Sequence, residues 1–309
     1  MADIKQTANE AYVTGYLKTI DLKNEIFDGK EVIGGHLVVL VEDKFGKSEV
    51  KVNVRQNAKK KDGNDNSLFK ALKTIQSTYK SIDAVGAENA DYIRVTGELQ
   101  DNFFFAVDKN EFIENKVIKG TFINRVEPKE NPSGCKAIVE GVVTEIKNKD
   151  DELYVEIVGI GYNGRATKFD GYILKELIPI FQQNYRIGCT TSLNFAIVNA
   201  IEVEEIQKEV GFGEALGEKI TRTITKRIIF GGDKPNYNGI NKEQIQQALA
   251  VRQSEMDKAR AKALEKANGG SMATGFAGQQ TASFTAPTET GFGMQGGAFS
   301  TQGMAFSVK

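Results

Sequence analysis

The sequence predicts a mainly β protein with minor α content, and three features of the chain lead to that fold class. The first is an internal repeat: residues 11–20 (AYVTGYLKTI) and 137–146 (AIVEGVVTEI) share the pattern Ala-x-Val-x-Gly-x-(Leu/Val)-x-x-Ile at an offset of 126. The second is the alternation of apolar and polar residues with period two, which is typical of strands with one buried face. The third is a change of composition near residue 269, after which Gly, Ser, Thr, Ala and Gln dominate.

The surroundings of the first repeat segment also have a clear pattern. Strand-like LVVLVED reaches a turn around Gly46, and SEVKVNV then alternates with period two. A helical stretch follows, and the apolar segments after it again read as strands. The predicted elements are strands at 37–43 and 48–54, a helix at 67–79, and strands at 92–100 and 117–126, with FFFAV at 103–107 between the last two.

The second repeat segment is followed by the same succession of elements. A strand ends at the pair Asn163-Gly164, which is a strong signal for a hairpin turn. Pro179 is expected to kink or shorten the helix that comes next. The predicted elements are strands at 153–160 and 165–169, a helix at 172–184, and strands at 191–201 and 220–230.

Each copy therefore has the order strand–strand–strand–helix–strand–strand. This is the order of the OB-fold, a five-stranded Greek-key barrel. A glycine inside the first strand of each copy, Gly15 and Gly141, fits a sharp bend at a barrel corner. In the first strand, Val13 and Leu17 are expected to face inward, and Tyr12 and Tyr16 outward.

The predicted organisation follows from these elements. Two OB-fold-like five-stranded barrels occupy residues 1–128 and 135–232, a C-terminal helix occupies 240–268, and a flexible tail occupies 269–309. Asn241 followed by Gln244 marks the start of that helix. The tail has too few large apolar residues to form a core, so we expect it to be disordered. Its phenylalanines recur every seven or eight residues, which fits either drift of composition or self-association and partner capture.

Bulk composition narrows the chemistry. The chain has 40 Lys and Arg against 41 Asp and Glu, so a nucleic-acid site must come from local clustering of basic residues. Two cysteines without a Cys-x-x-Cys motif, and a single histidine, His36, predict neither a metal site nor a cofactor. The polar N-terminus and the lack of a long apolar run predict a cytoplasmic protein without a membrane partner.

Local basic clusters do occur, and aromatic residues accompany them. Seven basic residues and one acidic residue lie between Lys44 and Lys61. Cations that contact phosphates, interleaved with aromatic rings that stack on bases, are typical of proteins that bind single-stranded nucleic acid. The candidate binding residues are Tyr12, Tyr16, Lys18, Phe45, Lys51, Arg55, Lys59, Lys60, Lys61, Phe103 and Phe104 in the first copy, and Tyr162, Arg165, Lys168, Phe169, Arg222, Lys226 and Arg227 in the second.

On these features the chain resembles the OB-fold single-stranded DNA-binding proteins. The paired barrels with a low-complexity tail resemble those encoded by bacteriophages, and TGELQDNFFF (96–105) is similar to their fourth strand and the loop after it. The resemblance implies protection of single-stranded DNA during replication or recombination, in the host cytoplasm if the protein is phage-encoded. The tail is a candidate for self-association or for contact with replication or recombination proteins. Bacterial members end in an acidic tip with a terminal aromatic residue, whereas this chain ends in AFSVK.

Enzymatic alternatives fit the sequence poorly. GIGYNG (159–164) matches Gly-x-Gly-x-x-Gly, but no acidic residue lies in the segment about 20 positions further on, and Asn163-Gly164 favours a hairpin turn. No P-loop or nucleophile-elbow motif occurs. We therefore predict a non-catalytic binding protein. A virion or assembly protein with a self-associating tail is the alternative, and RNA instead of DNA stays open as the ligand.

Overall fold

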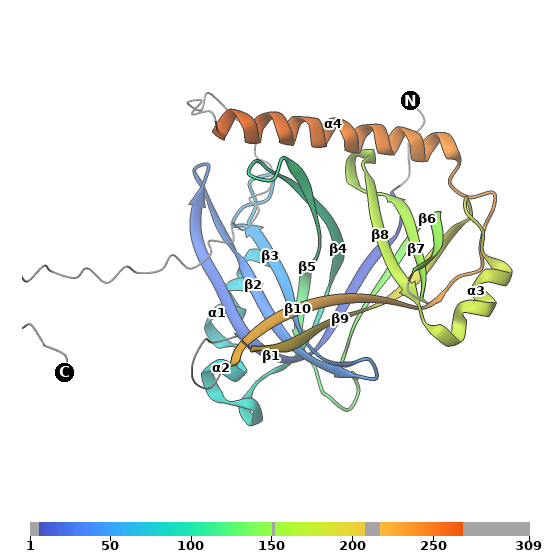
Figure 1. Ribbon diagram of the computed structural model, residues 1–309. Helices are drawn as coiled ribbons and strands as arrows, with labels where there is room; N and C mark the ends of the chain where they lie inside the picture. Colours follow the sequence, from blue (N-terminus) through green and yellow to red (C-terminus); the bar gives the residue numbers. More distant parts are fainter. Residues whose placement is uncertain (1–5, 150–151, 208–216, 268–309) are drawn as a thin grey trace, which may run out of the picture. The chain divides into compact units, whose positions relative to one another are not determined.

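The computed structural model describes residues 6–149, 152–207 and 217–267, without the side chains of residues 200–223. The predicted flexible tail at 269–309 lies outside these residues. Strands dominate the described part of the chain, and a long helix follows the last strand (Figure 1).

The first five strands form a closed barrel. Strand β1 pairs with β2 and β4, β2 pairs with β3, β4 pairs with β5, and a short parallel pairing of β3 with β5 closes the circuit. Helix α1 lies between the third and fourth strands, followed by the short helices α2 and η1. The bounds are β1 Asn9–Phe27, β2 Lys30–Asp43, β3 Gly46–Asn57, α1 Ser67–Thr78, α2 Ile82–Val85, η1 Ala87–Asn89, β4 Tyr92–Ala106 and β5 Glu111–Arg125.

The next five strands repeat this circuit, again with the parallel closure between the third and fifth strands. Both circuits have the strand order of the OB-fold. The bounds are β6 Gly134–Lys149, β7 Glu152–Ile160, η2 Tyr162–Gly164, β8 Ala166–Ile173, η3 Lys175–Leu177, α3 Ile178–Asn184, β9 Thr190–Gln207 and β10 Gly217–Gly232. The predicted fold class, mainly β with two five-stranded OB-like barrels and a C-terminal helix, is confirmed.

Two local expectations need correction. The helix predicted at 172–184 is shorter, because β8 continues to Ile173 and α3 begins only at Ile178. Of the two effects expected of Pro179, a kink or a shorter helix, the structure has the second: Pro179 lies in the first turn of α3, where a missing N–H costs nothing. The segment FFFAV was placed in a loop, but Phe103 to Phe105 belong to β4, and the connection to β5 spans only residues 107–110.

Alternating residues of the strands fill the barrels. Val13 and Leu17 are fully buried in the first barrel, and Phe169 and Phe195 in the second. Gly15 is required where β1 crosses β2, because a Cβ at this position would lie 2.2 Å from the carbonyl oxygen of Leu40. The inward set predicted for the first strand is therefore confirmed, and the glycine has a steric reason.

Helix α4 (Lys242–Ala267) begins with the predicted capping box. The backbone N–H of Gln244 donates to Asn241 Oδ1 at 2.8 Å, and that of Asn241 donates to Gln244 Oε1 at 3.0 Å. Ile245 and Ala248 then pack on Val158 and Ala166, so α4 covers one end of β7 and β8 (Figure 1). Among the described helices, none has the length and apolar character needed to cross a bilayer.

The two barrels meet where β1 pairs antiparallel with β6. In this register Ala11 pairs with Ala137, and these are equivalent positions of the sequence repeat. Asn9 pairs with Val139, and their repeat equivalents, Cys135 and Val13, pair with each other in turn. The seam therefore has the geometry of a two-fold dimer contact within one chain.

Contacts further from the seam obey the same two-fold. Asp101 of β4 accepts a hydrogen bond from the backbone N–H of Lys168 in the second barrel. At the equivalent place, Asn199 of β9 donates to the carbonyl oxygen of Glu49 in the first barrel at 3.1 Å. The β4–β5 and β9–β10 hairpins each continue beyond their own barrel and contact the third strand of the other.

Candidate nucleic-acid interface

The outer surface of β3 carries the predicted basic residues of the first barrel. Val50, Val52 and Val54 point into the barrel, which directs Lys51 and Arg55 outward, where both are exposed. The guanidinium of Arg55 lies 4.7 Å from the centre of the Phe27 ring, at the end of β1. An exposed cation beside an aromatic ring is thus present on strand three of an OB barrel.

His36 completes this surface on the neighbouring strand. It pairs in register with Asn53 of β3 and with Asp21 of β1, and its Nδ1 lies 3.5 Å from the Asp21 carboxylate. Partial burial and, to a smaller extent, the positive charge of Lys51 lower the pKa of His36 below its usual value. The imidazole is therefore neutral at pH 7. We call Phe27, His36, Lys51, Asn53 and Arg55 the first-barrel face.

Two other predicted cations of the first barrel, Lys18 and Lys59, are already engaged in ion pairs. Lys59 donates to Asp65 at 2.6 Å, Lys70 donates to the same carboxylate at 2.7 Å, and this lowers the pKa of Asp65 to about 2. Lys18 forms an ion pair with Glu49. Lys60 and Lys61, also predicted, are exposed in the connection between β3 and α1.

The second barrel presents a different surface at the equivalent place. Tyr154 of β7 and Tyr172 of β8 are cross-strand partners with ring centres 5.7 Å apart, and both rings are half-buried. Lys147 lies 4.8 Å from the Tyr154 ring and Lys226 lies 5.7 Å from the Tyr172 ring. Burial raises the pKa of Tyr154 above its usual value, so the hydroxyl keeps its proton at neutral pH. The candidate binding residues included neither Phe27 nor this tyrosine pair. Tyr154 was in a predicted strand, but Tyr172 was placed in the predicted helix at 172–184, so the sequence did not bring the two rings together.

Charge differs between the two barrels at matched positions. Val38 pairs with Lys51 in the first barrel, and the corresponding pair in the second is Glu156 with Asp170. The predicted Arg227 donates to Asp170 at 2.7 Å, and Lys226 forms an ion pair with Glu152. Cations thus protrude from the first barrel where acid–base pairs occupy the second.

Three predicted residues lie in a buried ionic cluster centred on Asp101. Arg165 donates to the Asp101 carbonyl oxygen at 2.9 Å, and Lys168 donates its backbone N–H to the carboxylate. The guanidinium groups of Arg165 and of Arg252 in α4 lie 5.7 and 5.1 Å from the centre of the Phe103 ring. This cluster joins β4, β8 and α4, so these residues hold the elements together.

The remaining predicted residues are scattered. Phe169 was expected at the surface, but it is fully buried in the second barrel, because it occupies an inward position of β8. Tyr162 is highly exposed at the β7–β8 turn, and Phe104 is partly exposed on β4. Tyr16 packs its ring edge-on against Tyr92 at 4.9 Å. Arg222 belongs to β10, but its side chain lies outside the described part of the structure.

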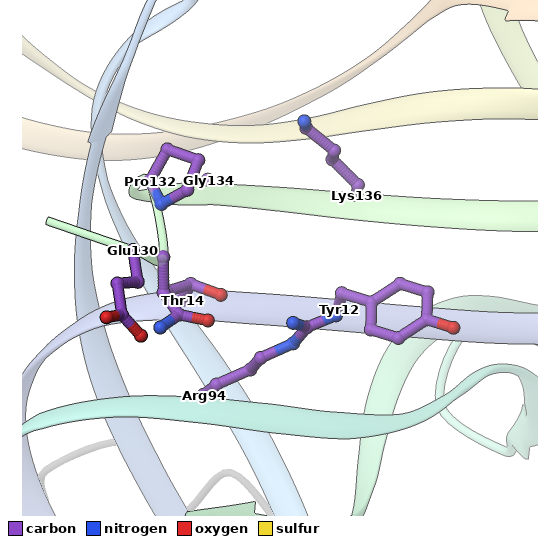
Figure 2. A pocket seen from close by; sticks show the side chains of 8 residues that line it. Tyr12, Thr14, Arg94, Glu130, Pro132, Gly134 and Lys136 are labelled. Carbon is purple, nitrogen blue, oxygen red and sulfur yellow. The ribbon is translucent and has the colours of Figure 1, made fainter. Parts of the chain in front are cut away.

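Tyr12 and Phe45 lie near the seam between the barrels. Tyr12 borders a pocket of about 200 Å³ together with Arg94, Lys136 and the 130–134 segment (Figure 2). Its hydroxyl donates to Glu10, and this hydrogen bond raises the pKa of Tyr12. Phe45, at the β2–β3 turn, contacts Phe230 of β10 with ring centres 5.9 Å apart.

Comparison with solved structures finds distant likenesses. A deletion mutant of the single-stranded DNA-binding protein from Thermus aquaticus shares 12% identity, with a TM-score of 0.46, over 77% of this chain and 98% of that one. The wild-type protein from the same organism shares 13% identity, with a TM-score of 0.44, over 77% and 97%. A replication protein A heterotrimer bound to single-stranded DNA shares 10% identity, with a TM-score of 0.20, over 84% and 54%.

The sequence has no significant match among curated proteins. One family model does match, and its description is YorF. The match spans residues 7–262, which include both barrels and nearly all of α4. The chain belongs to the YorF family.

Proposed function

We propose that this protein binds single-stranded DNA without catalysis and largely without regard to sequence. The observation that carries the proposal is the first-barrel face, where exposed Lys51 and Arg55 accompany the Phe27 ring on an OB barrel. The face of strands two and three, with the adjoining loops, is where OB-folds bind oligonucleotides. Lysine and arginine contact the phosphates there, and an aromatic ring stacks on bases of any identity.

The first barrel is proposed to make the stronger electrostatic contribution. Its third strand carries Lys51 where the second barrel has Asp170, which is already paired with Arg227. The tyrosine pair of the second barrel supplies stacking surface instead. Protection of single strands during replication or recombination, in the cytoplasm of a cell or a phage-infected host, is the role proposed for this binding. Self-association or capture of replication proteins is the role proposed for the tail.

Fluorescence anisotropy with a labelled oligo-dT, followed through a salt series, tests this proposal. We expect binding that weakens as salt rises and that exceeds binding to a duplex of the same length. The double variant Lys51→Ala/Arg55→Ala removes two phosphate contacts, and the slope of log K against log salt should flatten by about 1.4. A matched control, Lys80→Ala/Lys175→Ala, removes two exposed lysines elsewhere and should keep the wild-type slope.

Absence of binding at micromolar protein and low salt would reject the proposal. Assembly of the protein into particles without nucleic acid would then favour the structural alternative. An unchanged slope in the Lys51→Ala/Arg55→Ala variant, together with normal wild-type binding, would move the interface away from the first-barrel face. A parallel series with oligo-rU decides between DNA and RNA.

A further inference from the structure

Six side chains at the seam alternate between cations and aromatic rings. Four of the five neighbouring pairs lie within cation–π distance, and the fifth pair, Tyr12 and Lys136, are cross-strand partners. The guanidinium of Arg94 lies 5.2 Å from the centre of the Tyr12 ring, and Nζ of Lys136 lies 5.9 Å from the centre of the Phe230 ring. Lys44 then lies 5.6 Å from the Phe230 ring and 4.9 Å from the Phe45 ring. We call these six residues the seam row.

Strand register places the two halves of the row side by side. Tyr12 of β1 is the cross-strand partner of Lys136 of β6, and Arg94 of β4 approaches Tyr12 from its other side (Figure 2). Phe230 belongs to β10 and Phe45 to the β2–β3 turn, so the row draws on both barrels. It is not part of the first-barrel face, although the same β2–β3 hairpin carries residues of both.

The row is accessible and its cations are available. Arg94, Lys136 and Lys44 are exposed, and none forms an ion pair with a carboxylate of the described residues. The rings of Tyr12, Phe45 and Phe230 are half-buried, which holds them in place while part of each ring stays open to solvent. Three carboxylates lie nearby: Glu10 is engaged with the Tyr12 hydroxyl, Asp43 accepts a hydrogen bond from the backbone N–H of Phe45, and Glu130 is on the pocket rim.

The internal two-fold supplies a comparison within the molecule. The position equivalent to Tyr12 is Ile138, and the position equivalent to Lys136 is Glu10. Strand register likewise makes Ser192 the equivalent of Arg94. At these three positions the related half of the seam therefore has neither the alternation nor the positive charge. Because the strand pairing is the same in both halves, the fold alone does not require Tyr12, Lys136 or Arg94.

We propose that the seam row is a second contact surface for single-stranded nucleic acid, beyond the first-barrel face and bridging the two barrels. Phosphates lie against Arg94, Lys136 and Lys44, and bases stack on Tyr12, Phe230 and Phe45. A single strand has this same alternation of anionic and flat aromatic groups. An acidic peptide would be held by the three cations but would leave the interleaved rings without a role. The inference rests on the proposed function.

The test compares the full chain with two triple variants, using labelled oligo-dT longer than one OB-fold site, which means more than about 16 nucleotides. The seam variant is Lys44→Ala/Arg94→Ala/Lys136→Ala. The control, Lys80→Ala/Lys109→Ala/Lys175→Ala, removes the same charge at other exposed positions. We expect the seam variant to flatten the salt slope by about 2 and to lose roughly tenfold or more in affinity at low salt, with the control unchanged. Circular dichroism confirms that both variants are folded.

A second measurement locates the contact directly. An oligonucleotide carrying bromodeoxyuridine is crosslinked by ultraviolet light, and the modified peptides are mapped by mass spectrometry. Crosslinks at Tyr12, Phe45 or Phe230 support the proposal. Crosslinks confined to the first-barrel face, with a seam variant that binds like the control, overturn it while the proposed function stands. Failure of the wild-type chain to bind overturns both. Loss of poly-glutamate binding in the seam variant, with oligo-dT binding intact, would assign the row to an acidic protein partner.

Discussion

At the scale of single residues, Asp101 is the most heavily engaged charge in the described structure. It is fully buried, and its carboxylate pairs with Lys116 of β5 and with Arg252 of α4, which is itself 3% exposed. The backbone N–H of Lys168 in β8 donates to the same carboxylate at 2.9 Å. Buried charges are tolerated only while they stay paired, so this one residue ties three elements together.

Replacement of Asp101 by alanine should therefore be costly. Arg252 and Lys116 would lose their buried anion and keep only the partly exposed Glu114 as a partner, and we expect the free energy of unfolding to fall by about 3–5 kcal/mol. Urea denaturation followed by circular dichroism measures this. The two-fold equivalent supplies the control: Asn199→Ala removes hydrogen bonds to Glu49 and Thr225 from a more exposed site and should cost about 1 kcal/mol. Equal losses in the two variants would contradict the assignment.

The same cluster explains where sequence reasoning about the site reached its limit. Arg165 and Lys168 were identified as nucleic-acid contacts because they are basic and lie beside aromatic residues. Their partner, Asp101, is more than sixty positions away in the chain and meets them only through the seam between the barrels. No local pattern reports such a contact. Lys51 and Arg55 were predictable because alternation with three valines fixes the direction of their side chains.

At the scale of elements, the hairpins and their crossings determine the barrels. Period-two alternation predicted most strands, and the repeat predicted that the second set would follow the first. The end of β8 was not predictable, because the segment YILKELI (172–178) fits a strand and a helix equally well. Gly15 was predicted at a corner, and the close approach of Leu40 shows why only glycine fits there.

Substitution of Gly15 tests that crossing. A methyl group would overlap the Leu40 carbonyl, which lies 2.2 Å from the required Cβ position, so β1 and β2 must separate. We expect Gly15→Ala to lower the free energy of unfolding by about 1–3 kcal/mol, measured by thermal or urea denaturation. Gly134→Ala is the matched control at the start of β6, because the nearest atom there is 3.4 Å away. A neutral Gly15→Ala variant would mean that the crossing is looser than described.

At the scale of the whole described chain, the two barrels share one fold and have diverged in surface chemistry. The first has exposed cations beside Phe27, and the second has a tyrosine pair flanked by lysines that are themselves paired with glutamates. Helix α4 adds a further difference, because it covers the β7–β8 end of the second barrel. Val142 belongs to the buried cluster formed with α4, whereas its equivalent in the first barrel, Tyr16, is partly exposed.

This difference in surface chemistry predicts that variants of the two barrels will affect binding in different ways. Tyr172→Leu removes a stacking surface but no charge, so it should weaken oligo-dT binding by about 1–3 kcal/mol while leaving the salt slope unchanged. Lys51→Ala should instead flatten the slope by about 0.7. Anisotropy titrations at several salt concentrations separate the two effects. A Tyr172→Leu variant with wild-type affinity would remove the second barrel from the interface.

The internal two-fold axis at Ala11 and Ala137 has a consequence for the direction in which a single strand of nucleic acid would bind. A surface with true two-fold symmetry looks the same to a strand running 5′ to 3′ and to one running 3′ to 5′, so it would hold a single strand equally well either way round. The backbone of this seam has that symmetry, but Tyr12 against Ile138 and Lys136 against Glu10 do not. A strand lying along the seam row would therefore meet a different order of side chains when reversed, and the protein would bind it with a defined polarity.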